Sequence, residues 1–204
     1  TWDADGSTGN GGFSIPSGNG TETFNTAGEF FYICTNHIGS GMKGKITVQA
    51  ASGPSDLILT GVVDGPLPGG FPKVVELFVA NNIADLSIYG IGSDNTNNNG
   101  GSDGEEFTFP TVSATAGDYI YITNDSAGFN NFFGFDADYE SNAAGSNGDD
   151  AYELFMNGST VDIYGVIDLD GSGEVWDFLD GWAYRVDGTG PDDATFVPAN
   201  WTYS

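Results

Sequence analysis

Three side chains with soft ligand atoms lie within nine residues of one another in this sequence. Cys34, His37 and Met42 supply a thiolate, an imidazole and a thioether in the pattern Cys-x2-His-x4-Met. These groups suit a trigonal copper site that has a weak axial sulfur ligand. The segment GEFFYICTNHIGSGMKGKITV (residues 28–48) has strand-like runs on both sides of a loop punctuated by glycines. We therefore expect the three side chains to share one tight loop between neighbouring strands.

The supply of histidine limits the chemistry of the chain. His37 is its only histidine, so a serine or cysteine nucleophile would have no separate base and orienting group. Zinc hydrolysis lacks ligands, and no phosphate-binding glycine loop ends in lysine. Composition alone does not exclude a glycosidase that uses a pair of carboxylates, but no cluster of Trp, Asp and Glu indicates a sugar cleft. We expect the protein not to be an enzyme.

A second group of ligand atoms lies near the C-terminal end. Asp168, Asp170 and Ser172 place oxygen atoms at alternating positions, like the first half of an EF-hand loop. The twelfth position is Leu179 instead of the bidentate glutamate, so a complete EF-hand is not expected. The pattern favours a solvated turn and leaves a looser calcium site as the alternative.

The charge balance excludes several partners. The chain has 29 acidic and four basic residues, a formal charge of −25. Such a surface repels nucleic acid and anionic membranes, because almost no cations are present to displace phosphate counterions. No run approaches the ~18 apolar residues of a membrane span, and the sequence starts without a signal-peptide pattern, so a secreted protein would be present here in its mature form.

The elements that must position these residues are short strands. Thirty-two glycines and few helix-forming stretches favour an all-β fold with tight turns. Besides the strands at 29–35 and 43–50, we predict strands at 56–63, 73–80, 84–89, 105–109, 118–123, 151–156, 160–164 and 182–186. Asn157-Gly158 marks the clearest hairpin, and 94–104 is a low-complexity loop. Val75, Leu77, Val79, Tyr89, Tyr121, Tyr164 and Trp182 are predicted to face the core, and Arg185 to pair with buried carboxylates.

A linker of small residues, 51–55, separates two predicted domains, 1–50 and 56–204. The first resembles the plastocyanin-like branch of the cupredoxins, in its Cys-His-Met loop, its aromatic strand before Cys34 and the GMxGxIxV run after it. The resemblance implies that Cys34, His37 and Met42 ligate copper. It also implies a second histidine on strands upstream, which this chain does not contain. The upstream strands are absent from the sequence given, another chain supplies them, or the site is a relic.

The second predicted domain resembles the lamin-tail-type domain of secreted bacterial proteins. The similarity lies in VVELF and DLSIYGI, and in GDDAYELFMNGSTVDIYG further along the chain. It implies an immunoglobulin-like β-sandwich with an accessory or structural role at a secreted or cell-surface location. We therefore expect a non-enzymatic extracellular surface, matrix or appendage protein, with self-association or another chain completing the cupredoxin half. The alternative is a blue-copper electron-transfer module whose N-terminal strands are missing from this chain.

Overall fold

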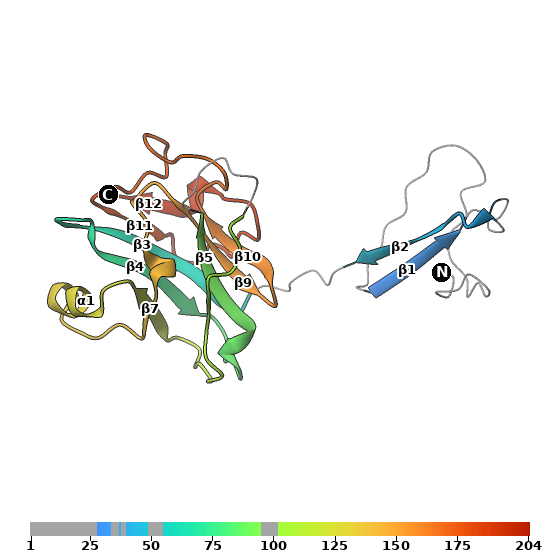
Figure 1. The fold of residues 1–204 in the computed structure, drawn as a ribbon. Helices are drawn as coiled ribbons and strands as arrows, with labels where there is room; N and C mark the ends of the chain where they lie inside the picture. Colours follow the sequence, from blue (N-terminus) through green and yellow to red (C-terminus); the bar gives the residue numbers. More distant parts are fainter. Residues whose placement is uncertain (1–27, 34–36, 38–39, 49–54, 95–101) are drawn as a thin grey trace. The chain divides into compact units, whose positions relative to one another are not determined.

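The chain divides into two compact units, Thr1–Gly53 and Pro54–Ser204 (Figure 1). The computed structural model describes residues 28–33, 37, 40–48, 55–94 and 102–204. Strands in three sheets make up most of the regular structure, so the predicted all-β fold is confirmed. The centre of the predicted loop at 94–104 lies outside the described residues.

The described part of the first unit is an antiparallel hairpin. Strand β1 (Gly28–Ile33) pairs with β2 (Lys43–Val48). Tyr32 lies opposite Gly44, and a Cβ at Gly44 would be 2.4 Å from the tyrosine ring. Only glycine therefore lets the ring pack across the neighbouring strand. The strand pair predicted on either side of the copper loop is present, although its predicted ends at 34–35 and 49–50 lie outside the described residues.

The second unit is a sandwich of two sheets. One has the order β12-β11-β3-β4-β7-β8, with bounds Trp201–Tyr203, Trp182–Arg185, Leu57–Leu67, Phe71–Val79, Tyr119–Thr123 and Tyr139–Glu140. The other has the order β10-β9-β5-β6, with bounds Ser159–Tyr164, Ala151–Met156, Tyr89–Asp94 and Phe107–Thr108. All neighbouring strands are antiparallel except β7 and β8. The short strands β8 and β12 were not predicted from the sequence.

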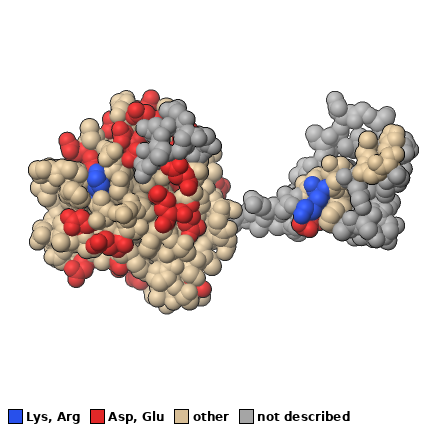
Figure 2. Space-filling model, in the orientation of Figure 1, with Lys and Arg blue, Asp and Glu red and all other residues tan. Residues whose placement is uncertain are grey.

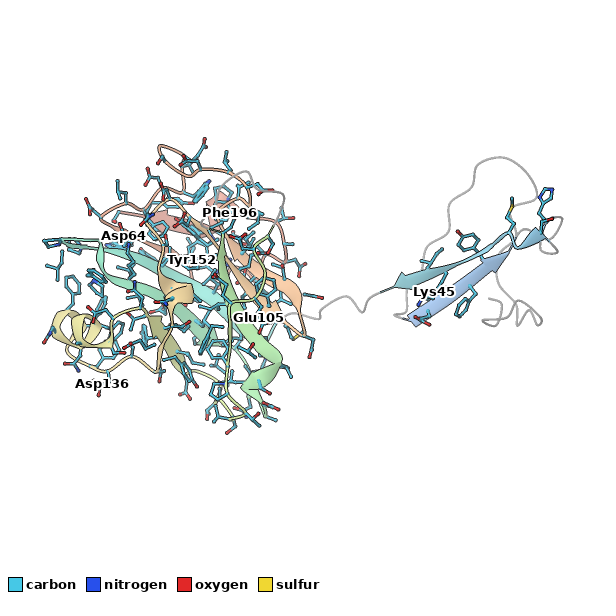
Figure 3. All side chains as sticks on the ribbon, in the orientation of Figure 1. Lys45, Asp64, Glu105, Asp136, Tyr152 and Phe196 are labelled. Atoms are coloured by element: carbon cyan, nitrogen blue, oxygen red, sulfur yellow. The ribbon has the colours of Figure 1, made fainter. Side chains whose placement is uncertain are left out.

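Side chains of both sheets meet in one core. Val75, Leu77 and Val79 on β4 are fully buried, as their alternation predicts. Tyr89 and Tyr164 are buried as predicted. Tyr152 on β9, labelled in Figure 3, is also buried and was not among the predicted core residues. The prediction for Trp182 is wrong because it lies on the outer face of the six-stranded sheet with 41% of its surface exposed. Tyr121 is also on that outer face and only half-buried.

One predicted strand is replaced by a different structure. Residues 84–88 include the 3₁₀ turn η2 (Leu86–Ile88), and β5 begins only at Tyr89. The Asp85 carboxylate accepts a hydrogen bond from the Ser87 N–H at 2.9 Å. This local bond gives the backbone an alternative to the ladder of a sheet, so a strand at 84–89 is not formed.

The unit also contains a helix that composition argued against. Helix α1 (Ser126–Phe133) begins after Asp125, whose carboxylate accepts from the Gly128 N–H at 3.0 Å, and ends at Gly134 in the left-handed conformation (φ 82°). An aspartate before the first turn and a glycine after the last are the usual helix boundaries. This pair was the signal that the sequence offered. Among the described residues, no helix has the length and apolarity needed to cross a bilayer.

The predicted hairpin around Asn157-Gly158 is confirmed. Strands β9 and β10 pair antiparallel, and the two turn residues have φ values of 52° and 76°. Two positive φ values in succession fit the right-handed twist of the strands, and asparagine and glycine adopt them at little cost.

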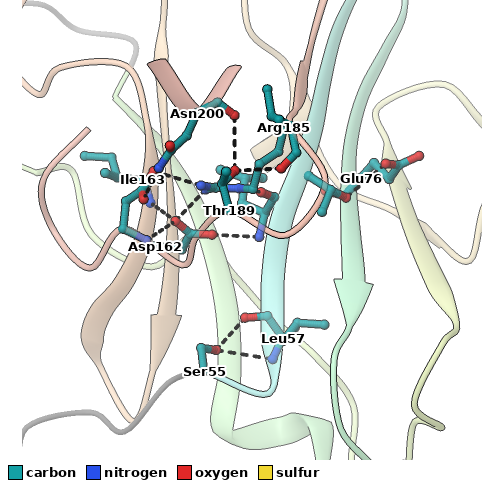
Figure 4. A network of polar contacts seen from close by, with 12 residues as sticks. Ser55, Leu57, Glu76, Asp162, Ile163, Arg185, Thr189 and Asn200 are labelled. Atoms are coloured by element: carbon teal, nitrogen blue, oxygen red, sulfur yellow. Dashed lines mark hydrogen bonds and ion pairs between the residues drawn. The ribbon is translucent and has the colours of Figure 1, made fainter. Parts of the chain in front are cut away.

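This unit contains buried ion pairs, and one of them connects its two sheets. Arg185 on β11 contacts Asp162 on β10 at 2.6 Å and Asp192 at 2.8 Å, and all three side chains are almost fully buried (Figure 4). The prediction that Arg185 pairs with buried carboxylates is confirmed. Lys73 on β4 is also buried and contacts Asp64 at 2.6 Å. The described basic side chains of this unit thus have structural partners.

Candidate functional site

Two of the three predicted copper ligands lie at one end of the hairpin. His37 is in the turn between β1 and β2, and its carbonyl oxygen accepts from the N–H groups of Ser40 (2.9 Å) and Met42 (3.2 Å). Both His37 and Met42 are exposed, Met42 by 54%. Cys34 lies outside the described residues. The turn therefore holds the backbones of His37 and Met42 close together at a solvent-facing end of the hairpin.

The sulfur and nitrogen donor atoms of this loop are of the types that bind copper, but they are too few for a blue-copper centre. Such a centre takes two imidazoles, a thiolate and a weak axial ligand, and the sequence has one histidine. Among the described residues, which do not include Cys34, no group of three or more His, Cys, Asp or Glu side chains is arranged to hold a metal ion. Cys34, His37 and Met42 would supply three of the four ligands, and the second imidazole would come from another source.

One comparison with known proteins concerns this loop. Residues 13–49 match the family model for copper binding proteins of the plastocyanin/azurin family. The match includes Cys34, His37 and Met42 and does not extend into the Pro54–Ser204 unit. No curated protein and no solved structure matched the chain. The cupredoxin-like element predicted from the sequence is supported, whereas the lamin-tail-type resemblance stays a prediction.

Hydrogen bonds within the loop and to neighbouring segments hold the predicted calcium loop. The Asp170 carboxylate accepts from the Ser172 N–H, and the Ser172 hydroxyl donates to the Asp149 carboxylate, both at 2.9 Å. The Asp168 N–H donates to Asp94 at the end of β5. Asp170 and Ser172 are exposed, and Asp168 is half-buried. Intramolecular partners thus engage Asp170 and Ser172, and calcium at Asp168, Asp170 and Ser172 stays a prediction.

The negative charge of the chain is concentrated in the second unit. Pro54–Ser204 contains 25 of the 29 acidic residues and only two of the four basic ones, Lys73 and Arg185. Both are buried in ion pairs. Figure 2 shows acidic side chains scattered over the visible face of this unit, with blue confined to one small spot. The unit therefore has many exposed carboxylates and no exposed basic side chain among its described residues.

The outer face of the six-stranded sheet carries a groove that sequence reasoning missed. Its centre is a row of residues in register across four strands: Tyr184 on β11 lies opposite Gly61 on β3, Gly61 opposite Glu76 on β4, and Glu76 opposite Tyr121 on β7. Gly61 has no side chain, and a Cβ there would lie 3.2 Å from the Cβ of Glu76. The missing side chain leaves a notch between Tyr184 and Glu76.

Aromatic rings form two walls of this groove, which has a volume of about 310 Å³. Trp182 and Tyr184 stack on each other with ring centroids 5.0 Å apart on one side. On the other side, Phe129 and Phe133 of helix α1 line the groove. Trp182, Tyr184 and Phe133 are 41, 47 and 39% exposed. The groove is thus an open, mostly apolar site, and the side chains of Trp182, Tyr184 and Phe133 are partly exposed in it.

Glu76 is the charged group of the groove. Its carboxylate accepts from the Thr60 hydroxyl at 2.9 Å. Lys73 and Arg185 bind other carboxylates, so neither neutralises Glu76. Burial raises the pKa of the Tyr121 hydroxyl, and the adjacent negative charge of Glu76 raises it further. A carboxylate among aromatic rings favours a positively charged ligand.

Proposed function

We propose that this chain is a non-enzymatic extracellular β protein whose cupredoxin-like hairpin is completed by strands of another chain, in a surface, matrix or appendage assembly. The observation that carries the proposal is the exposed apolar surface of the first unit in its described part. This part consists of two strands that expose apolar side chains, with Tyr32 50% and Ile46 37% exposed. The family match over 13–49, which includes this hairpin, supports a cupredoxin-like element here.

A two-stranded hairpin is at best marginally stable in water. In the described part of this unit, the outer edges of β1 and β2 have no strand beside them. Unpaired edge N–H and C=O groups and exposed apolar side chains favour the addition of a further strand. A partner chain that pairs with an edge would bury Tyr32 or Ile46 and could also bring the second imidazole to Cys34, His37 and Met42.

The Pro54–Ser204 unit suits a scaffold in such an assembly. In this proposal it is a lamin-tail-type accessory domain. Its support is that the innermost charged groups serve the fold: Asp162 pairs with Arg185, and Asp64 with Lys73. Groups committed to internal ion pairs are poorly placed for acid–base chemistry on a substrate.

Strand addition can be tested with Ile46→Lys, which places a charge on the exposed apolar surface of β2. We expect the full chain to form oligomers at micromolar concentration and the variant to associate at least ~10-fold more weakly, because burying an unpaired ammonium is costly. Size-exclusion chromatography with light scattering measures the effect. Ile88→Lys is the matched control, since Ile88 is 39% exposed in the second unit. A strictly monomeric wild-type chain, or equal effects of the two variants, would contradict the proposal.

The family match favours a second candidate function, a blue-copper electron-transfer module. Cys34, His37 and Met42 would hold the ion, and bound copper would supply one-electron transfer. Under the leading proposal, we expect the isolated chain, at a concentration too low for oligomers, to stay without the blue thiolate-to-copper absorption when Cu²⁺ is added, because the monomer lacks the second imidazole. Visible absorption spectroscopy measures this directly. An intense band in the isolated wild-type chain that Cys34→Ser abolishes, and that Asp168→Asn leaves intact, would establish the electron-transfer module instead.

A further inference from the structure

We propose that the groove lined by Gly61, Glu76, Tyr121, Trp182 and Tyr184 binds an arginine side chain presented by a basic polypeptide. The groove lies entirely in the Pro54–Ser204 unit and uses no residue of the copper loop. The inference therefore goes beyond the proposed function, and each can fail without the other.

The first argument is the match between the groove and a guanidinium group. A guanidinium is planar, stacks on aromatic faces and donates paired hydrogen bonds to a carboxylate. The stacked rings of Trp182 and Tyr184 offer the aromatic face, and Glu76 offers the carboxylate across the notch at Gly61. An ammonium group would match the charge but not the planar stacking.

The chain already uses this chemistry in its interior. The guanidinium carbon of Arg185 lies 4.6 Å from the ring centroid of Trp201 while its nitrogens bind Asp162 and Asp192. The outer-face groove presents the same two components, an aromatic ring and a carboxylate. The groove lacks the third component, a basic side chain. Among the described residues, this unit cannot supply one, because Lys73 and Arg185 are both buried in ion pairs elsewhere.

The second argument favours a polypeptide over a small cation. Exposed aromatic side chains continue beyond the groove along helix α1 and its end, where Phe132 is 46% and Phe135 44% exposed. Aromatic residues are enriched in protein–protein interfaces, and contiguous exposed apolar surface marks interaction sites. The Pro54–Ser204 unit as a whole has 25 acidic and only two basic residues, and this negative charge would attract a basic partner and speed its association.

The test titrates the full 204-residue chain with fluorescently labelled hexa-arginine at about 0.15 M salt, where long-range attraction between exposed charges is largely screened. Hexa-citrulline has the same shape without the charge, and hexa-lysine has the charge without the planar group. The groove variants are Glu76→Gln and Trp182→Ala, from two different strands. Their matched controls are Glu174→Gln and Tyr119→Ala, which remove an exposed carboxylate and a 50% exposed ring outside the groove. Circular dichroism verifies that each variant is folded.

We expect each groove variant to weaken hexa-arginine binding about 10-fold, as loss of a charge-assisted hydrogen bond or a cation–π contact implies. The control variants should stay within about 2-fold of wild type, because exposed groups contribute little. Hexa-citrulline should not bind, and hexa-lysine should bind more weakly than hexa-arginine. Equal losses for Glu76→Gln and Glu174→Gln would reduce the interaction to general charge attraction and overturn the proposal. Trp182-dependent binding of tetramethylammonium or a neutral oligosaccharide, without a preference for hexa-arginine, would overturn it as well.

Discussion

Replacing Arg185 with methionine is expected to lower the free energy of unfolding of the Pro54–Ser204 unit by about 3–5 kcal/mol, the usual cost of removing one partner of a buried ion pair. The Asp162 carboxylate is fully buried, and burial raises its pKa, an effect that Arg185 and three backbone N–H groups oppose. Without the guanidinium, Asp162 would keep a buried negative charge with no cation beside it. Urea unfolding followed by tryptophan fluorescence would measure the change.

The geometry of the Arg185 network explains why a positive charge at this position is not sufficient for full stability. The Arg185 guanidinium donates from Nε to the Leu59 carbonyl (2.6 Å), from Nη2 to Asp162 (2.6 Å) and from Nη1 to Asp192 (2.8 Å), as Figure 4 shows in part. An ammonium cannot reproduce this planar arrangement. Arg185→Lys is therefore the control, and its loss of stability should be smaller than that of Arg185→Met but clearly measurable. Wild-type stability of Arg185→Met would show that the network contributes nothing net.

The same arginine shows where sequence reasoning about the fold reached its limit. In the run WAYRV, residues 182–186, apolar side chains occupy both phases of a strand, so alternation does not decide which face is buried. The structure buries Ala183 and Arg185, because Asp162 on the other sheet provides a partner for the guanidinium. Trp182 is consequently on the outer face. Where one phase is clearly apolar, as in β4, the sequence sufficed to predict the buried face.

The two candidate sites, the copper loop and the groove, also differ in how far the sequence could predict them. Cys34, His37 and Met42 could be found from the sequence because all three lie on one local loop. The groove could not, since Gly61, Glu76, Tyr121 and Tyr184 become neighbours only through the register of four strands. Helix α1, which completes the groove, was missed because its signal was a pair of capping residues in a sequence poor in helix-forming residues.

The second large effect concerns Tyr164, which lies at the centre of an aromatic cluster in the second unit. Its ring contacts Trp176, Phe178, Phe196 and Trp201, with centroids 4.7 to 6.2 Å apart. Its hydroxyl donates to the Trp176 carbonyl, and burial raises the pKa of the phenol, so it stays protonated as a donor. The cluster joins β10 and β12 to the segments at 165–181 and 186–200, which include the predicted calcium loop.

Tyr164→Ala is therefore expected to cost about 3–5 kcal/mol of unfolding free energy, because it leaves a large cavity among four rings. Tyr164→Phe keeps the ring and removes the hydroxyl, so its cost should be about 1–3 kcal/mol, the penalty of a buried carbonyl left without a donor. Tyr119→Ala, at a tyrosine 50% exposed on β7, should cost less than about 1 kcal/mol. Chemical denaturation of the three variants measures the order. If Tyr164→Ala were no more destabilising than Tyr119→Ala, the aromatic cluster would not be what holds these long loop segments to the sandwich.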